Sequence, residues 1–212
     1  NIQHLTAELE AGVRLELCEG DLTDGQSLQR VVDYAEPTVV FHLAAQSYPT
    51  ASFQSPVATL DTKILGTARL LQALQRLGNS SMRIHVCSSS EVFGRVPSEY
   101  LPISESAPFH PASPYSISKI GTDLLGQFWA EAYDMNIWVT RMFTHTGPRR
   151  GETFAESSFA KQIALIEAGE VRPVVRVGNL ESLRTWADVR DAVRAYHLLV
   201  TAGLPRGSAY NI

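Results

Sequence analysis

Cysteine is scarce in this sequence, which has only Cys18 and Cys87 among its 212 residues. Two cysteines are too few for a framework of disulfides, and isolated thiols are typical of proteins in a reducing compartment. Long hydrophobic runs are missing too, because none reaches the roughly 18 residues that a helix needs to cross a bilayer. The polar first stretch, "NIQHLTAELEAG", is unlike a secretory signal. We therefore expect a cytoplasmic protein that does not bind membranes.

Positive charge is neither abundant nor clustered. The 18 Lys and Arg residues are outnumbered by 22 Asp and Glu residues, which leaves a net charge of −4. A chain without a basic block lacks the electrostatic footprint of a nucleic-acid-binding protein. Neither nucleic acid nor a metal ion is expected as a partner. With 44% hydrophobic residues, the chain can form one good core with a small lobe attached.

Hydrophobic periodicity predicts alternating strands and helices in the first two thirds of the chain. "TVVFHLAAQS" opens with a continuous apolar run, which fits a strand buried on both faces of a parallel sheet. A short strand that ends in an acidic turn is expected at 13–24, and further strands at 38–47, 83–90 and 136–143. Helices are expected at 24–35, 55–78 and 114–134. This alternation implies right-handed crossovers and an α/β fold with a doubly wound parallel sheet.

The pattern changes after residue 143. Residues 144–158 are rich in Gly, Pro and Arg, which predicts an irregular loop. A helix at 158–169, a strand at 174–179 and a helix at 190–203 are expected to follow. Because ligands of such sheets bind beyond the carboxyl ends of the strands, the residues after each apolar run are the candidates for a site.

Small, hydroxylic or charged residues follow the predicted strands, in "GDLTD", "LAAQS", "SSSEVFG" and "FTHTGPRRG". Small side chains let a flat cofactor approach the backbone, so Leu43 to Ala45 could lie along such a cofactor. Asp21 could accept a hydrogen bond from an adenine edge. Tight packing between helix and sheet explains "LAA" equally well. In "SSSE", the hydroxyls could donate to a substrate oxygen and Glu91 could act as a base; an exposed turn is the structural alternative.

"SPYSISK" places Tyr115 and Lys119 four residues apart, on one face of the predicted helix. A nearby ammonium favours the phenolate, which would lower the pKa of Tyr115 and suit it to acid–base chemistry. A surface pair without chemistry has the same spacing. The combination of a hydroxyl, a carboxylate and a Tyr–Lys turn on successive strand ends is much rarer than any one of these features.

These stretches together resemble the extended short-chain dehydrogenase/reductase family. The resemblance rests on "GDLTD", "FHLAAQS", "CSSSEVFG", "SPYSISK" and "RMFTHTGPRRG", and it spans nearly all of the sequence. Within that family the chain is most similar to the GDP-mannose 4,6-dehydratases and to the GDP-4-keto-6-deoxymannose reductases. "GPRRGETF" resembles the dehydratases, and "VGNLESLRTWADVRDAVRAY" resembles both groups.

Three departures accompany the resemblance. The Gly-rich dinucleotide motif and the first strands of the fold do not precede "VRLELCEGD", and the chain stops at "AYNI", where the family continues. We therefore expect a fragment, with a Rossmann-like dinucleotide-binding domain over 1–143. Residues 144–212 would form part of the substrate-binding lobe, interleaved with elements that return to the first domain. The family's "FNH" is "FTH" here, so Thr144 replaces an Asn that steadies the sugar nucleotide.

The resemblance implies a dehydratase that uses tightly bound NADP. Tyr115 would take the proton from the sugar's fourth hydroxyl, and Glu91 the proton from carbon five. Ser89 would help to protonate the hydroxyl that leaves carbon six, and Lys119 would bind the ribose. The implied cofactor-binding residues are Asp21, Leu22, Leu43, Ala44, Ala45, Gln46, Ser47, Lys119, His145 and Arg150. The implied substrate-binding residues are Ser47, Ser90, Glu91, Thr144, Asn179 and Arg184.

Two arginine predictions have structural alternatives. Arg149 and Arg150 suit phosphate, because a guanidinium can bind it bidentately. No acidic partner for them is evident in the sequence, but a solvated loop would also carry such residues. Arg184 is a candidate for binding the diphosphate of the sugar nucleotide, or else a surface residue near a helix end.

Other functions remain open at this stage. A reductase would share Tyr115 and Lys119 but would not need Glu91 as a base, and an epimerase would return the hydride to the same carbon. A catalytically silent dinucleotide-binding module is the alternative from another class, which the intact Tyr115, Lys119 and Glu91 disfavour. NAD instead of NADP, and a heptose instead of mannose, are further alternatives. We expect a homodimer or homotetramer.

Overall fold

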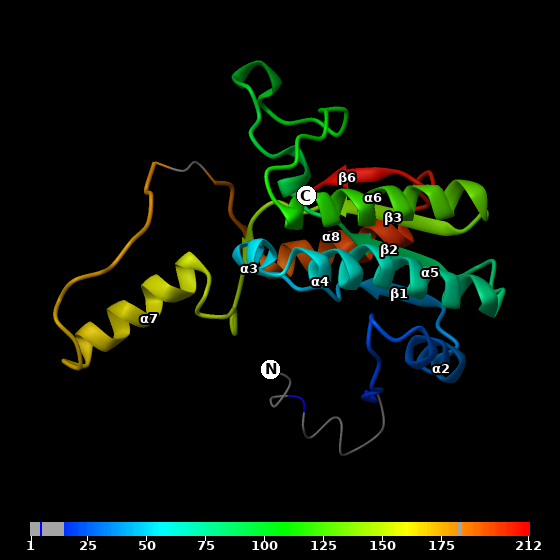
Figure 1. The fold of residues 1–212 in the computed structure, drawn as a ribbon, viewed down its shortest axis with the longest axis horizontal. Coiled ribbons are helices and arrows are strands. Elements are labelled where there is room, and N and C mark those ends of the chain that lie inside the picture. Colours follow the sequence, from blue (N-terminus) through cyan, green and yellow to red (C-terminus); the bar gives the residue numbers. More distant parts are fainter. Residues whose placement is uncertain (1–4, 6–14, 182–183) are drawn as a thin grey trace.

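A four-stranded parallel sheet forms the centre of the computed structural model, which describes residues 5, 15–181 and 184–212 (Figure 1). The strands lie in the order β1-β2-β3-β6, and each pairs in parallel with its neighbour. Their bounds are Val39–His42, Arg83–Cys87, Asn136–Arg141 and Ala209–Asn211. A second sheet consists of two short parallel strands, β4 (His145–Thr146) and β5 (Ala187–Asp188).

Helices connect the strands. The α-helices are α2 (Gly25–Ala35), α3 (Pro49–Gln54), α4 (Pro56–Leu60), α5 (Gly66–Leu77), α6 (Pro114–Ala132), α7 (Ala155–Glu167) and α8 (Val189–Thr201). A π-helical turn, η2 (Asp61–Leu65), joins α4 to α5. Two short 3-10 turns, η3 (Ser90–Phe93) and η4 (Ser98–Tyr100), follow β2.

The sheet is covered on both faces, as the α/β prediction requires (Figure 1). Alternate side chains of a strand point to opposite faces, so Ile84 and Val86 of β2 pack in the cluster beneath α5 and α6. On the other face, His85 stacks on Tyr196 of α8, with 4.3 Å between the ring centroids. Trp138 of β3 packs against α8 on the same face. These two apolar layers confirm a parallel sheet between helices.

Local signals in the sequence explain where the main helices begin and end. The side chains of Asp24 and Ser113 accept hydrogen bonds from the backbone N–H groups of Gln26 and Ser116, which caps α2 and α6. Pro114 lies in the first turn of α6, where its missing N–H costs nothing. Gly78 ends α5 with φ +70°, a left-handed conformation that glycine adopts without strain.

Two predicted strands are wrong within the described residues. Residues 15–20 of the expected 13–24 strand form no ladder; residues 13 and 14 lie outside the described part. Residues 174–179 are exposed and also unpaired. Both segments have strand-like side chains, but a strand forms only against a neighbour, and the described residues supply none.

Two further expectations need correction. β1 was expected to be buried on both faces, but it is an edge strand of this sheet, and only His42 of its residues is buried. The helix expected over 55–78 is interrupted by the π turn η2, and α3 forms separately before it. The three-residue strand β6 is too short to show periodicity, so sequence patterns gave no sign of it.

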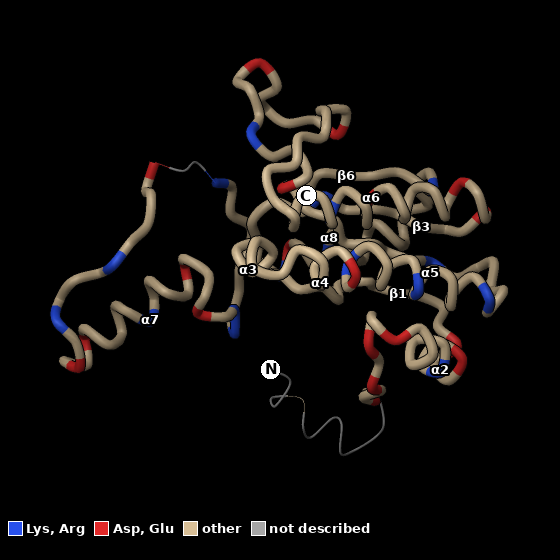
Figure 2. The backbone as a smooth tube through the Cα atoms, viewed as in Figure 1, with Lys and Arg blue, Asp and Glu red and all other residues tan. Residues whose placement is uncertain are grey.

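The segment from 147 to 181 leaves the sheet and carries α7 to one side of the molecule (Figure 1). None of the residues of α7 is buried, whereas α8 and β6 return to the sheet. The predicted division at residue 143 stays a prediction. Lys and Arg residues are dispersed along the described chain (Figure 2). Within the described residues, no helix has the length and apolar character needed to cross a membrane.

Candidate active site

Tyr115 and Lys119 lie one turn apart near the start of α6, close to the carboxyl end of β2. Both side chains are buried, with 8% and 6% of their surface exposed. The N–H of Tyr115 donates to Oγ of Ser52 on α3 at 3.1 Å, and Oγ of Ser118 donates to the Tyr115 carbonyl at 2.6 Å. Ser52 therefore fixes the first turn of α6, a role that no sequence signal indicated because α3 itself was not expected.

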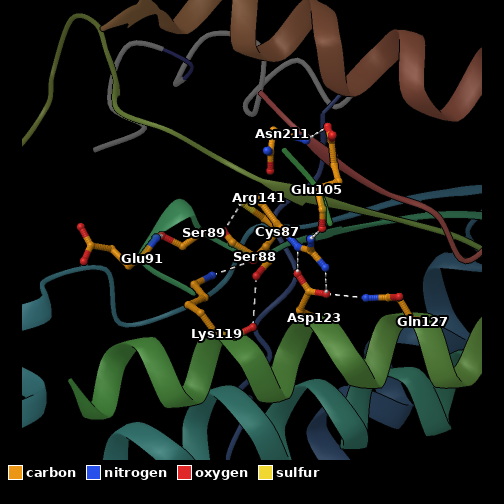
Figure 3. Close-up of polar contacts among 10 residues, drawn as sticks. All are labelled: Cys87, Ser88, Ser89, Glu91, Glu105, Lys119, Asp123, Gln127, Arg141 and Asn211. Carbon is orange, nitrogen blue, oxygen red and sulfur yellow. Dashed lines mark hydrogen bonds and ion pairs between the residues drawn. The ribbon is translucent and has the colours of Figure 1, made fainter. Parts of the chain in front are cut away.

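Lys119 connects α6 to the end of β2 (Figure 3). Its Nζ donates to the carbonyl oxygen of Cys87 at 2.6 Å. In return, Oγ of Ser88 donates to the Lys119 carbonyl at 3.1 Å. The two hydrogen bonds hold the "SSSE" segment against the helix that carries Tyr115. The sequence pattern predicted that the "SSSE" segment and the Tyr–Lys turn lie at the same edge of the sheet.

The expected lowering of the Tyr115 pKa by Lys119 is not found. Burial raises the pKa of Tyr115 to about 12, and a hydrogen bond with the Ser89 side chain lowers it by less. Burial likewise lowers the pKa of Lys119. The Lys119 ammonium is directed at the Cys87 carbonyl, so the loss of hydration dominates the electrostatics of the phenol.

A second lysine, Lys63, contacts Tyr115 and was missed in the sequence. Its Nζ lies 3.4 Å from the centroid of the Tyr115 ring. The side chain is only 1% exposed, and burial lowers its pKa to about 7. Little in the sequence indicated this burial, because Thr59 and Thr67, which are buried four residues to either side of Lys63, are polar and form no apolar stripe.

Ser89 and Glu91 lie in the turn after β2. Oγ of Ser89 accepts a hydrogen bond from the Glu91 N–H at 3.2 Å and so caps η3. The Glu91 carboxylate points away from Lys119 (Figure 3). It forms an ion pair with Arg184, in which Nη1 and Oε1 are 3.3 Å apart. The structure thus brings together Tyr115, Ser89, Glu91 and Arg184.

The residues expected along a cofactor form an open surface at the end of β1. Leu43, Ala44 and Ser47 are exposed, and Ala45 and Gln46 are partly buried. The Leu43 side chain is 53% exposed, so the surface can take a flat apolar ring. Leu43 and Ala44 are therefore not buried between helix and sheet, and their contact with a cofactor stays a prediction.

The loop of Asp21 and Leu22 is held by α5. The Leu22 carbonyl accepts from Nη1 of Arg69 at 3.1 Å. A Cβ at Gly66 would lie 2.8 Å from Cβ of Leu22, so only glycine allows this contact. The Asp21 carboxylate accepts from Thr23, and these hydrogen bonds lower its pKa.

A family model described as "GDP-mannose 4,6 dehydratase" matches residues 1–212 of the sequence. The chain belongs to the GDP-mannose 4,6-dehydratase family. Its motifs are those from which the resemblance was inferred, and the inference is confirmed.

Relatives and solved structures agree with the family assignment. The GDP-mannose 4,6-dehydratase of Vibrio cholerae serotype O1 is 35% identical over 198 residues, which are 93% of this chain and 52% of the relative. The GDP-6-deoxy-D-mannose reductase of Pseudomonas aeruginosa is 36% identical over 176 residues, 83% of this chain and 57% of the relative. The chain spans about half the length of the dehydratases it matches.

Two solved structures extend the comparison to the fold. The Pseudomonas aeruginosa RMD structure, complexed with NADPH, has a TM-score of 0.87 at 34% identity and covers 99% of this chain and 73% of its own. A dTDP-glucose 4,6-dehydratase from Streptomyces venezuelae, with NAD and TYD bound, has a TM-score of 0.81 at 29% identity and covers 97% of this chain and 60% of its own. The Rossmann-like fold that the motifs implied is confirmed.

Arg150, which was predicted to bind phosphate, has more internal partners than expected. Arg150 forms an ion pair with Glu156, with 2.5 Å between Nε and Oε1. Its Nη1 donates to the His145 carbonyl at 2.8 Å, and its guanidinium lies 3.9 Å from the centroid of the Phe154 ring. The expectation that Arg149 and Arg150 have no acidic partner is wrong for Arg150, because Glu156 lies six residues further along, on α7. Arg149 is exposed with φ +69°.

The remaining predicted residues are divided between the site and its periphery. The N–H of Ser90 donates to the Met142 carbonyl at 2.8 Å, and the Thr144 carbonyl accepts from the Ala187 N–H at 3.0 Å. Ser90 and Thr144 therefore lie next to the ends of sheet strands. Asn179 is exposed on the segment that follows α7, where its side chain accepts from the Glu181 N–H. The structure does not bring Asn179 into contact with the other candidates.

A buried ion pair supports the site from behind. Arg141, at the end of β3, binds Asp123 of α6 through Nε at 2.8 Å and Nη2 at 3.1 Å. Its Nη1 donates to the Glu105 carbonyl at 2.7 Å, and the Glu105 carboxylate accepts from the Asn211 N–H (Figure 3). This network joins β3, α6 and β6, and nothing in the sequence patterns pointed to it.

Proposed function

We propose that the full-length protein is an NADP-dependent GDP-mannose 4,6-dehydratase, which converts a GDP-hexose to its 4-keto-6-deoxy form. The observation that carries this proposal is the convergence of Tyr115, Ser89 and Glu91 at the end of β2. The Ser89 side chain lowers the pKa of the Tyr115 phenol, which burial raises, and Oγ of Ser89 accepts from the Glu91 N–H. Family membership supports the same reaction.

Each of these side chains has a role that its chemistry allows. Tyr115 takes the proton from the fourth hydroxyl as carbon four is oxidised. The new ketone makes the proton on carbon five acidic, so a carboxylate such as Glu91 suffices to remove it. The Ser89 hydroxyl donates a hydrogen bond to the oxygen that leaves carbon six. Arg184, beside Glu91, binds the diphosphate of the sugar nucleotide.

The cofactor residues fit NADP, which when bound would supply the redox chemistry of the reaction. The exposed surface of Leu43 and Ala44 would hold the flat part of the nucleotide, and Asp21 would accept from the adenine. Lys119 would bind the ribose. His145 and Arg150, with their neighbour Arg149, lie on the loop proposed to meet phosphate. The similarity of the P. aeruginosa structure, which is complexed with NADPH, supports this assignment.

A GDP-4-keto-6-deoxymannose reductase is the second candidate. The 36% identity to a GDP-6-deoxy-D-mannose reductase favours it, and so does the ion pair that engages Glu91, the residue that a reductase would not need as a base. Incubation of the full-length protein with GDP-mannose, followed by mass spectrometry, separates the two. Loss of one water supports the dehydratase, and an unchanged mass contradicts it.

Assembly and location are also proposed. We expect a homodimer or homotetramer, because Ile117, Leu124 and Phe128 form an exposed apolar stripe along α6. Exposed Leu65 belongs to η2, which packs on the same helix. A cytoplasmic location is supported by Cys18 and Cys87, which are both free thiols. Sedimentation analysis of the full-length protein tests the oligomeric state.

A further inference from the structure

Lys63 lies against the candidate catalytic phenol although none of the reaction steps above uses it. It belongs to η2, the π-helical turn between α4 and α5. Its Nζ is buried without a hydrogen-bond partner in the described structure, at 3.4 Å from the centroid of the Tyr115 ring. A buried ammonium without a hydrogen bond is costly, so the contact with the ring is its main compensation.

The position of Lys63 is held by the helix that carries Tyr115. The Lys63 carbonyl accepts a hydrogen bond from Oγ1 of Thr122 on α6, at 3.3 Å. Cβ of a residue at position 121 would lie 2.7 Å from the Ile64 side chain, so Gly121 allows η2 to approach α6 closely. Isolated π turns inside helices are frequent at functional sites. The turn thus fixes the ammonium and the phenol relative to one another.

The charged and titratable groups around this pair come from three elements. Lys119 of α6 repels the Lys63 ammonium and adds to the lowering of its pKa by burial. Cys87 of β2 and Glu91 of η3 raise the pKa of Tyr115, although less than burial does. Lys63 is therefore the cation in direct contact with the ring, while the Lys119 ammonium binds the Cys87 carbonyl.

We propose that Lys63 is a positioning residue that stabilises the ionised form of Tyr115 through its charge over the ring face. A cation over an aromatic face is attracted by the π electrons, and the attraction is stronger where water is excluded. When the phenol loses its proton, part of the negative charge spreads over the ring, so the attraction increases. The two titrations are coupled: burial lowers the pKa of Lys63 to about 7, but a phenolate under the side chain favours its ammonium in turn. Lys63 therefore favours the phenolate over the phenol and opposes the effect of burial.

The proposal rests on the proposed function only in making Tyr115 the proton acceptor, and its first test does not use turnover. The full-length protein is labelled with 3-fluorotyrosine, whose more acidic phenol titrates where the protein stays folded. Fluorine NMR then follows the Tyr115 signal, which is assigned by its loss in Tyr115→Phe. In Lys63→Met, we expect the Tyr115 midpoint to rise by about one pH unit, a tenfold change in the ionisation constant.

Matched variants separate charge from packing. Lys63→Arg keeps the cation, so its Tyr115 midpoint should stay close to the parent value. Lys63→Gln is neutral but polar, and it repeats the test if Lys63→Met does not fold. Lys161→Met removes an exposed lysine of α7 and should change nothing. A midpoint that is the same in the parent and in a folded neutral variant would overturn the proposal.

The pH dependence of turnover is the second test. In the neutral variants the acidic limb of the pH–rate profile should move to higher pH by the same amount, with the rate largely restored in alkaline buffer. A rate reduced equally at every pH would mean that Lys63 has only a structural role and would contradict the proposal. If no GDP-hexose is turned over, the proposed function fails, while the NMR titration still decides the role of Lys63.

Discussion

Arg184 and Glu91 are 93 residues apart in the sequence and form an ion pair in the candidate site. Each was singled out for a different reason, Glu91 as a base and Arg184 as a ligand for diphosphate. Their contact suggests a link between binding and catalysis, because a diphosphate that binds Arg184 competes with the carboxylate. Substrate binding would then release Glu91 next to carbon five.

Glu91→Gln separates the dehydratase from the reductase. The amide keeps the size of the side chain and much of its hydrogen bonding but removes the base. General base catalysis typically contributes about 10²–10⁴-fold, so turnover of GDP-mannose should fall by that factor. Oxidation of carbon four should persist, so the near-ultraviolet absorbance of reduced nicotinamide should rise in the same reaction.

The control for this variant is Glu99→Gln, which changes an exposed carboxylate of η4. It should leave turnover unchanged. Near-normal turnover of GDP-mannose by Glu91→Gln would remove the role assigned to this residue and would favour a function without proton abstraction from carbon five.

Arg150→Ala tests the phosphate loop. A charge-assisted hydrogen bond contributes about 1.5–3 kcal/mol, so losing one to a phosphate should weaken cofactor binding by at least about tenfold. Glu156→Gln removes the internal partner of Arg150 and leaves the guanidinium in place. It should therefore keep cofactor affinity within about twofold. Calorimetric titration of both variants with NADP measures the difference. Equal losses of NADP affinity in the two variants would show that Arg150 acts through its ion pair with Glu156 and not on the phosphate.

The buried pair of Arg141 and Asp123 should matter for stability. Asp123→Asn leaves the Arg141 guanidinium, 7% exposed, without its counter-charge. Breaking a buried pair in this way costs about 3–5 kcal/mol of the free energy of unfolding. Urea denaturation followed by circular dichroism measures the loss. The matched change Glu152→Gln, in an exposed pair with Lys161, should cost less than about 1 kcal/mol. Similar losses in both variants would contradict this account.

The fold was readable from the sequence where the signal is local. The strands β2 and β3 and the helices α2 and α6 depend on neighbours within a few residues, so they were predicted well. The strand expected at 174–179 failed because pairing depends on a distant partner. Ser89 and Glu91 of the candidate cluster could be singled out because they follow a strand end, and their catalytic role stays a prediction.

The missed features of the site all depend on three-dimensional contact. Ser52 caps α6 from another helix, and Arg141 meets Asp123 through a pairing that no pattern encodes. The pKa of Tyr115 was predicted in the wrong direction for the same kind of reason. Spacing along the helix brought Lys119 near in sequence, but burial and the Cys87 carbonyl determine the electrostatics.

Acid should destabilise the protein through its buried histidines. His42 is buried beside Oγ1 of Thr67, and burial lowers its pKa from 6.5 to about 4. Between these values the unfolded chain binds more protons than the folded one. This contribution to stability is therefore complete above pH 6.5 and is lost as the pH falls toward 4. At pH 5 the loss in the free energy of unfolding is about 1–2 kcal/mol for one such site.

The measurement compares unfolding by urea at pH 7.5 and pH 5 in the parent and in His42→Gln. Because Gln does not titrate, the variant should lose about 1–2 kcal/mol less on acidification than the parent does. His85, whose pKa burial lowers to about 3, keeps part of the acid sensitivity in that variant. His197→Gln changes an exposed histidine of α8, so its loss on acidification should match that of the parent. If His42→Gln is as acid-sensitive as the parent, then the buried imidazole does not carry the effect, and the carboxylates paired in the folded state do.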